Sequence, residues 1–289
     1  MIDGLEIISS GLYTTIQDNG RFGFSKFGVP KSGAMDLQSF FLANAILNND
    51  KNCAVIEWTI IPPVLKFHKS TVVTITGAVC MPYLNDMKQK MNCQLQVHEG
   101  DILRLKNVTK GVYGFVGIKF GFQSEEVFNS RSQYKMITTS SILQKSDVVS
   151  YKKFVDFSAS NSSIHIPVFW CESNLIPVFK GPDFDLLSSS QKVDLLHMDF
   201  TISKDRNRMA IPLYELLEND LDSMLTSPVL PGTVQLTPSG KLIVLMRDCQ
   251  TTGGYLRVLQ LANDAINRIA QKRMGERISF KLQSYRDII

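Results

Sequence analysis

The sequence has few of the residues that build disulfide frameworks or metal sites. Its 289 residues include only 5 cysteines and 4 histidines, and no Cys-x-x-Cys, His-x-His or His-Glu-x-x-His spacing occurs. An odd number of widely separated cysteines does not indicate paired disulfides, so we expect reduced thiols. Zinc and other transition metals require clustered ligands that the local spacing does not supply. We therefore predict no metal site.

Clustered charge and long apolar runs are also lacking. The 31 Lys and Arg residues exceed the 27 Asp and Glu residues only slightly, and the cations are scattered. Nucleic-acid binding requires clustered cations, so the composition does not favour it. No run reaches the roughly 18 apolar residues of a membrane helix, and the first residues do not resemble a signal peptide. We expect a soluble, cytoplasmic protein that binds neither nucleic acid nor membrane.

What the sequence does contain is a regular succession of short β-type segments. Runs rich in Val, Ile, Thr and Phe lie between turn residues at positions 5–8, 54–60, 64–68, 71–76, 102–105 and 113–120. This pattern predicts a mainly β protein with a few helices, folded into a barrel or sandwich. Gly100, between residues 95–97 and 102–105, further predicts a β-hairpin.

Helices are expected at three places. The first begins at Asp36, a favourable N-cap, and continues with apolar residues at helical spacing. Its buried face is predicted to hold Leu37, Phe40, Phe41 and Ala45. The second covers residues 258–273 and ends before Gly275, which suits a left-handed helix stop. A third, shorter helix is expected over residues 214–225.

One polar segment predicts a division of the chain. Residues 156–163 read DFSASNSS, which contributes little to a core and is typical of a linker or surface loop. We therefore predict an N-terminal β-barrel lobe over residues 1–160 and a second lobe over residues 161–289. A strand over residues 164–171 is expected to open the second lobe.

Two polar strings containing glycine carry the chemical information. The first reads TTIQDNGRFGF at residues 14–24 and continues as GVPKSGAMD at residues 28–36. The second comprises PGTVQ at residues 231–235, then PSG, and ends as DCQTTGGY at residues 248–255. Carboxylate, amide and hydroxyl groups beside glycines can orient a planar amide, which needs both donors and acceptors. The same residue types also form capped, self-bonded loops without a ligand.

The strings resemble the motifs of the KipA family, which is also described as the C subunit of 5-oxoprolinase or as allophanate hydrolase subunit 2. In that family a Thr-Thr-x-Gln-Asp-x-Gly-Arg-x-Gly run precedes Gly-Val-Pro-x-Ser-Gly-Ala-Met-Asp, as it does here. The resemblance implies cyclophilin-like β-barrel lobes, two in tandem. It also implies kinship with the carboxyltransferase part of urea carboxylase.

The resemblance and the residue chemistry together give a set of candidate site residues. Catalysis is expected to involve Asp248, Gln250 and Arg208. Either Arg208 or Arg21 could hold a carboxylate through its planar guanidinium group. Substrate binding is expected at Gln17, Asp18, Arg21, Asn207, Gln235, Thr251, Thr252, Gly253 and Gly254.

Two segments depart from the family pattern. The family has a glycine-rich middle segment where this chain reads NSRSQYKMITTS at residues 129–140. The stretch NRMAIPL at residues 207–213 lacks a glycine and a second arginine of the family. If these loops line the site, the substrate pocket is altered or catalysis is weakened.

The resemblance implies an enzyme that works as part of a complex. The C subunit of the ATP-dependent 5-oxoprolinase works with the A and B subunits to hydrolyse 5-oxo-L-proline to L-glutamate. The expected partners are a KipI-like protein and a LamB/YcsF-like protein, which correspond to the B and A subunits, respectively. ATP would act at the level of the complex, because the chain has no Gly-x-x-x-x-Gly-Lys-Ser/Thr loop.

Two alternatives stay open from the sequence. One is a carboxyltransferase component that acts on a urea-like amide. Biotin would then be carried elsewhere, because the chain has no Met-Lys-Met attachment site. The other is a non-catalytic regulator of the KipA type, which binds a KipI-like kinase inhibitor.

Overall fold

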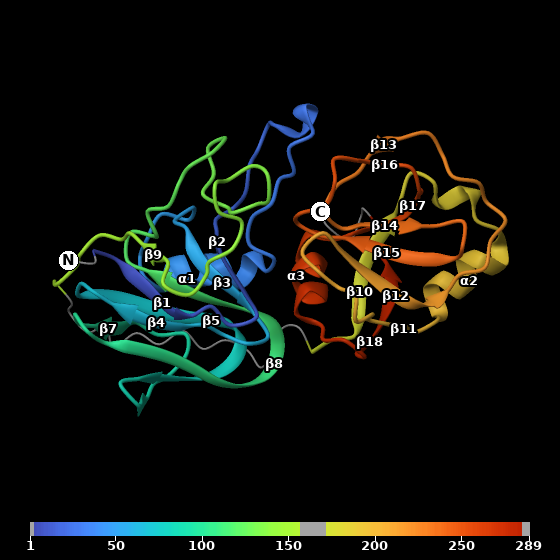
Figure 1. Ribbon diagram of the computed structural model, residues 1–289. Coiled ribbons are helices and arrows are strands. Elements are labelled where there is room, and N and C mark those ends of the chain that lie inside the picture. The colour runs from blue at the N-terminus through green and yellow to red at the C-terminus, as the bar shows by residue number, and fades with distance from the viewer. Residues whose placement is uncertain (1–2, 157–171, 285–289) are drawn as a thin grey trace. The chain divides into compact units, whose positions relative to one another are not determined.

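The computed structural model describes residues 3–156 and 172–284, which belong to two compact units (Figure 1). Unit 1 comprises Met1–Phe22 and Ser32–Val168, and unit 2 comprises Gly23–Lys31 and Phe169–Ile289. The expected linker at 156–163, the lobe boundary at 160 and the strand at 164–171 fall, apart from residue 156, outside the described residues. A short N-terminal segment, Gly23–Lys31, thus packs with the C-terminal unit.

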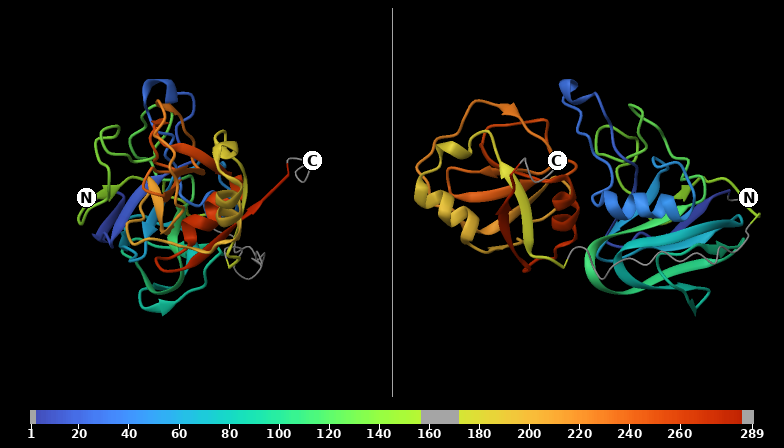
Figure 2. Two further views of the ribbon diagram at one scale, coloured as in Figure 1. Left: turned by 90° about the vertical axis from the view of Figure 1, so that its right-hand side faces the viewer. Right: turned by 180° about the vertical axis from the view of Figure 1, so that it is seen from behind.

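Unit 1 is a single antiparallel sheet that curls into a half-barrel (Figures 1 and 2). Its elements are β1 (Leu5–Ser9), β2 (Tyr13–Gln17), α1 (Leu37–Ile46), β3 (Val55–Thr59), β4 (Val64–Phe67), β5 (Thr71–Leu84), β6 (Met87–Lys88), β7 (Leu95–Val97), β8 (Ile102–Ile118) and β9 (Val148–Val149). The strand order is β2-β3-β8-β4-β1-β9, and β5 pairs with β6, β7 and β8. The two long strands β5 and β8 pair with each other and with most of the other strands, so they hold the sheet together.

The core of unit 1 depends on a close fit between β3 and β8. Trp58 on β3 is fully buried and lies opposite Gly114 on β8. A Cβ atom at Gly114 would come within 2.0 Å of Cζ2 of the Trp58 ring. Any side chain at Gly114 would therefore displace the indole, which explains the glycine within the strand.

Helix α1 begins as predicted, but its buried face differs from the expected one. Asp36 caps the helix by accepting from the backbone N–H groups of Gln38 and Ser39, at 3.0 and 3.1 Å. The buried apolar side chains are Phe40, Ala43 and Ile46. The predicted positions Phe41 and Ala45 are exposed and Leu37 is half-buried. The helix packs on β5 and β8 through the Phe40 side, so of the expected face only Phe40 was correct.

Unit 2 is a near-closed barrel with short helical segments (Figure 1). Its elements are η1 (Ser25–Phe27), β10 (Leu175–Lys180), η2 (Phe184–Leu186), α2 (Ser189–His197), β11 (Phe200–Thr201), β12 (Ala210–Leu216), β13 (Ser227–Pro228), β14 (Thr233–Leu236), β15 (Lys241–Leu245), β16 (Thr252–Gly253), β17 (Leu256–Leu261), α3 (Asn263–Gln271) and β18 (Arg277–Leu282). The seven-stranded sheet has the order β11-β18-β10-β17-β14-β15-β12. A bridge between Ile202 and Leu213 joins its two ends. The mainly β prediction with barrel lobes is confirmed.

Three local predictions in the two units were wrong. The helix expected over 258–273 begins only at Asn263, because residues 256–261 form the central strand β17. Residues 214–225 contain the end of β12 and no helix. Gly100 has the predicted positive φ of 89°, but the strands beside it, β7 and β8, pair with β5 and β4 and not with each other.

Among the residues that the structure describes, no helix combines the length and apolar character needed to cross a membrane.

Candidate functional site

The DCQTTGGY segment, residues 248–255, forms a loop in unit 2 that is fixed by backbone pairing. It follows β15, and its central residues form β16, which pairs with β13. The N–H of Val229 donates to the carbonyl of Thr251 at 3.1 Å, and the N–H of Met224 donates to the carbonyl of Gly254 at 3.0 Å. The loop therefore has a defined conformation that can hold its side chains in place.

Asp248 and Arg208, both predicted to be catalytic, form a buried ion pair. Nε of Arg208 lies 2.7 Å from Oδ2 of Asp248, and Nη2 lies 3.0 Å from Oδ1. The side chains of Asp248 and Arg208 are only 8% and 6% exposed, respectively. The N–H of Asp248 also donates to the carbonyl of Arg208 at 2.9 Å. This bidentate geometry fixes the orientation of the Asp248 carboxylate.

Gln235 on β14 brings an amide group to the same loop. Its side chain is 1% exposed, and its Nε2 finds no acceptor within the described parts of the chain. A Cβ atom at Gly253 would lie 2.5 Å from Nε2 of Gln235 and 3.4 Å from Nε2 of Gln250. The two amides therefore converge on Gly253, which leaves the space that they need.

An amide donor that is buried without an acceptor is costly, so its presence needs an explanation. Leaving such a donor without a partner costs about 1–3 kcal/mol. Native proteins satisfy most of these groups, and each exception reflects strain, a catalytic role, or a bound water or ion. The Nε2 group of Gln235 is thus a buried donor whose hydrogen bond is not made within the described residues.

Three other candidate residues of unit 2 lie beside the ion pair or within the loop. Asn207 is exposed, and its Oδ1 accepts from the N–H groups of Met209 and Ala210 at 2.8 and 3.1 Å. It therefore shapes the turn that presents Arg208. Thr251 is half-buried and Thr252 is exposed, so both hydroxyls lie at the accessible side of the loop.

Cys249 lies within the loop but is not suited to nucleophilic chemistry. Burial, assisted by the charge of Asp248, raises the pKa of its thiol to about 12. The thiolate is the reactive form of cysteine, and near neutral pH it is almost absent at this pKa. The loop is therefore equipped for hydrogen bonding and not for attack by sulfur.

Asp18, a predicted substrate-binding residue, is the centre of a buried network in unit 1. Its carboxylate accepts from the N–H of Gly20 at 2.8 Å and from the N–H of Arg131 at 2.7 Å. It also accepts from the hydroxyls of Ser130 and Ser132, at 2.7 and 2.6 Å. These contacts anchor the middle segment that departs from the family pattern.

Gln17 and Arg21 hold the same segment. Nε2 of Gln17 donates to Oγ1 of Thr15 at 3.0 Å and to the carbonyl of Gln133 at 3.3 Å. Arg21, which is 2% exposed, donates to the carbonyl of Ser132. The three candidates of the first string therefore act together on residues 130–133, and their role in substrate binding stays a prediction.

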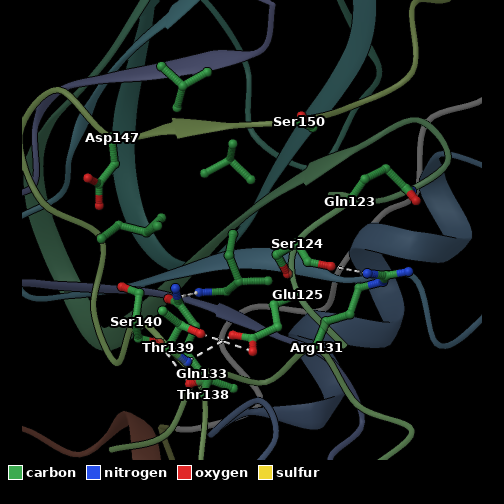
Figure 3. A pocket seen from close by; sticks show the side chains of 14 residues that line it. Gln123, Ser124, Glu125, Arg131, Gln133, Thr138, Thr139, Ser140, Asp147 and Ser150 are labelled. Atoms are coloured by element: carbon green, nitrogen blue, oxygen red, sulfur yellow. Dashed lines mark hydrogen bonds between the residues drawn. The ribbon is translucent and has the colours of Figure 1, made fainter. Parts of the chain in front are cut away.

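The middle segment lines a cavity of about 640 Å³ in unit 1 (Figure 3). Residues from 131–140 contribute Arg131, Gln133, Thr138, Thr139 and Ser140. In Figure 3, Glu125 accepts from the N–H and the hydroxyl of Thr139, at 2.9 and 3.1 Å. The segment in which the family resemblance led us to expect glycines thus supplies polar side chains to the wall of this cavity.

Within the described residues, no group of three or more His, Cys, Asp or Glu side chains could hold a metal ion.

Comparison with known proteins adds a family and a structural match. Residues 27–282 match the family model described as carboxyltransferase domain, subdomain A and B. The C subunit of the 5-oxoprolinase of Escherichia coli (strain K12) is 29% identical over 282 residues, which cover 96% of this chain and 90% of that protein. The urea amidolyase of Lachancea kluyveri is 38% identical over 132 residues, 45% of this chain but only 7% of that protein.

The solved structure of the Kluyveromyces lactis urea amidolyase superimposes on 98% of this chain with a TM-score of 0.87. The two sequences are 24% identical, and the matched region is 19% of that enzyme. This similarity concerns the fold. It shows that the half-barrel and the near-closed barrel occur together in a much longer protein.

Proposed function

Because this chain belongs to the family of carboxyltransferase domains, subdomains A and B, we propose that it acts as the C subunit of an ATP-dependent 5-oxoprolinase. In this proposal the chain works in a cytoplasmic complex that hydrolyses 5-oxo-L-proline to L-glutamate. The near full-length similarity to the Escherichia coli 5-oxoprolinase component supports this reaction over others.

The observation that carries the proposal is the convergence of Gln235 and Gln250 on Gly253, beside the loop that begins at Asp248. A lactam presents one carbonyl acceptor and one N–H donor on a flat ring. The Nε2 group of Gln235 would donate to the carbonyl oxygen, and Asp248 would accept from the ring N–H. Arg208 would act as a positioning residue that fixes the Asp248 carboxylate.

ATP and the remaining steps are assigned to the complex. ATP would supply the activation of the ring carbonyl oxygen, and no phosphate-binding loop of the P-loop type occurs in this sequence. KipI-like and LamB/YcsF-like proteins are the proposed partners. The contribution of this chain is then to bind and orient the lactam and to hold its N–H proton in a defined hydrogen bond.

A second candidate is a carboxyltransferase component that acts on a urea-like amide. The 38% identity to a urea amidolyase over 132 residues favours this candidate. The same amide and carboxylate groups would bind urea, which also presents one carbonyl and N–H donors. Biotin would then be carried elsewhere than on the residues of this sequence.

The two candidates are separated by a reconstitution experiment. The chain, co-expressed with KipI-like and LamB/YcsF-like partners, is expected to form a complex that releases glutamate from 5-oxoproline only when ATP is present. Glutamate is measured with and without ATP, with this chain omitted as the control. In a second arm, a biotin carboxylase, a biotinylated carrier and bicarbonate are added, and the consumption of urea is measured. ATP-dependent consumption of urea without glutamate release would favour the carboxyltransferase. A stable complex without any turnover would overturn both and favour the KipA-type regulator.

A further inference from the structure

Residues 214–225, which lead from the end of β12 toward β13, expose large apolar side chains. Tyr214 and Leu216 are 49% and 53% exposed, and Leu225 is 93% exposed. Burial alternates along β12, which places Tyr214 and Leu216 on its exposed side. Single exposed apolar residues are common on proteins, whereas several within one short segment favour a contact surface.

The same residues carry negative charge, so we call residues 214–225 the acidic segment. Glu218, Asp220 and Asp222 are exposed, and within residues 3–156 and 172–284 none of them forms an ion pair. Residues 209–240 contain no Lys, Arg or His, although the chain has a formal net charge of +4. Lys241, which lies opposite Leu216 on β15, offsets only part of this charge. The acidic segment therefore has an excess of negative charge beside its apolar side chains.

Hydrogen bonds give the acidic segment a defined conformation where the chain passes α2 (Figure 1). Nδ2 of Asn219 donates to the carbonyls of Leu217 and Thr237, at 3.1 and 3.2 Å. Nε2 of Gln191 on α2 donates to the carbonyl of Glu218 at 2.9 Å. A surface that is ordered before binding loses less conformational entropy when a partner docks on it.

The end of the acidic segment is attached to the candidate site. The N–H of Met224 donates to the carbonyl of Gly254 at 3.0 Å. Directly after the segment, β13 pairs with β16, which places Pro228 opposite Thr252. A partner bound to the acidic segment would therefore contact a stretch of chain that is bonded to the loop at residues 248–255.

We propose that the acidic segment docks a basic surface of a partner subunit. Apolar side chains of the partner would cover Tyr214 and Leu216, while its Lys or Arg side chains face the three carboxylates. Complementary charge speeds encounter and sets the orientation of the partner, and aromatic and apolar side chains at the core of an interface are buried from water. This docking rests on the proposed function, which supplies the complex.

Docking is tested by calorimetric titration of the purified chain with the KipI-like protein, with the LamB/YcsF-like protein and with both together, without ATP or 5-oxoproline. We expect binding whose affinity falls as the NaCl concentration rises from about 0.05 to 0.5 M, because salt screens exposed charges. An affinity that does not depend on salt, or no binding in any of the three titrations, would overturn the proposal.

Charge reversal identifies the acidic segment as the place of docking. The triple variant Glu218→Lys/Asp220→Lys/Asp222→Lys is expected to weaken binding at least about 10-fold at low salt and to flatten its salt dependence, because like charges then face each other. The three side chains are exposed, so thermal melting should show a folded protein. Unchanged affinity in this folded variant would contradict the assignment.

A matched control separates docking from an effect of net charge. The variant Asp50→Lys/Glu99→Lys/Asp199→Lys makes the same change of net charge at three exposed acids outside the acidic segment, none of which has an ion pair in the described parts of the chain. It should change the affinity less than about 3-fold. Equal weakening by the two triple variants would overturn the proposal.

The apolar side chains are tested by the double variant Tyr214→Ser/Leu216→Ser. It should weaken binding about 10-fold and keep the salt dependence, because it removes apolar contact area and no charge. Unchanged affinity would contradict the docking of a partner on β12. Sedimentation of the chain alone examines a second copy as the occupant, and self-association that is lost in the charge-reversed variant would overturn the proposal.

Glutamate release distinguishes this docking from the proposed hydrolase. A complex that forms, weakens in the charge-reversed variant and releases no glutamate would support the docking and contradict the hydrolase. A complex that releases glutamate, and that the charge-reversed variant joins with unchanged affinity, would support the hydrolase and overturn the docking.

Discussion

Replacing Arg208 with alanine is expected to lower the free energy of unfolding of unit 2 by about 3–5 kcal/mol. The variant leaves the Asp248 carboxylate buried at 8% exposure without the guanidinium group that donates to both of its oxygens. Breaking a buried pair is far more costly than removing the pair as a whole, because one charge stays desolvated. Chemical denaturation of the purified chain measures the effect.

Two controls make this result specific. Arg268 forms a more exposed pair with Asp264 at 2.8 Å, so Arg268→Ala should cost less than about 1 kcal/mol. The double variant Arg208→Met/Asp248→Leu should be less destabilised than the sum of the two single variants. Equal losses for Arg208→Ala and Arg268→Ala would show that the buried pair does not hold the loop.

Gly253→Ala is expected to reduce ATP-dependent glutamate release by about 100-fold, the usual effect of losing one positioned donor. The new methyl group would lie 2.5 Å from Nε2 of Gln235, and the end of that flexible side chain must move away. The stability cost should stay below about 1 kcal/mol, because the clash is with a movable amide group. Activity and melting temperature are measured on the same reconstituted complex.

The matched comparison is Gly254→Ala in the same loop. A Cβ atom there meets only the carbonyl oxygen of Met224, at 3.3 Å, and does not approach Gln235. We expect a loss of a few-fold at most from this change. If both variants lose activity equally, or if Gly253→Ala retains it, the position of the Gln235 amide is not important for turnover.

Helix caps and alternating apolar patterns in the sequence predicted the features that depend on interactions between residues close together in the chain. Asp36 caps α1 because its side chain reaches two backbone N–H groups of the first turn. Gly275 has a positive φ of 84°, but it does not stop the helix as predicted, because α3 ends at Gln271, Lys272 is extended, and Gly275 lies in the turn before β18. The β-rich pattern likewise predicted the two barrel-like sheets. The α2 helix was missed because it buries only Leu195 and shows little periodicity, although Ser188 and Gln191 form a capping box.

Features set by long-range packing could not be predicted from local patterns. Residues 256–261 carry apolar side chains that fit a helix or a strand, and only their pairing with β10 and β14 decides for the strand. Membership of Gly23–Lys31 in unit 2 depends on contacts that no local pattern records.

For the candidate site, too, the sequence indicated the residues but not their arrangement in space. The second string and the family resemblance indicated Asp248, Arg208 and Gln235. Their geometry required the fold, because the ion pair joins residues 40 positions apart and the register of β13 with β16 places Gly253. The convergence of the two amides on one glycine was therefore visible only in three dimensions.

The most direct test of this account is the stability and turnover of a Gln235→Met variant in the reconstituted complex. Methionine keeps the length of the side chain and removes a buried N–H group that has no acceptor in the described structure, so stability should stay equal or rise. Glutamate release should nevertheless fall by about 100-fold, because the lactam carbonyl loses its donor. A variant that is as active as the unmodified chain would contradict the assignment of this loop as the substrate site.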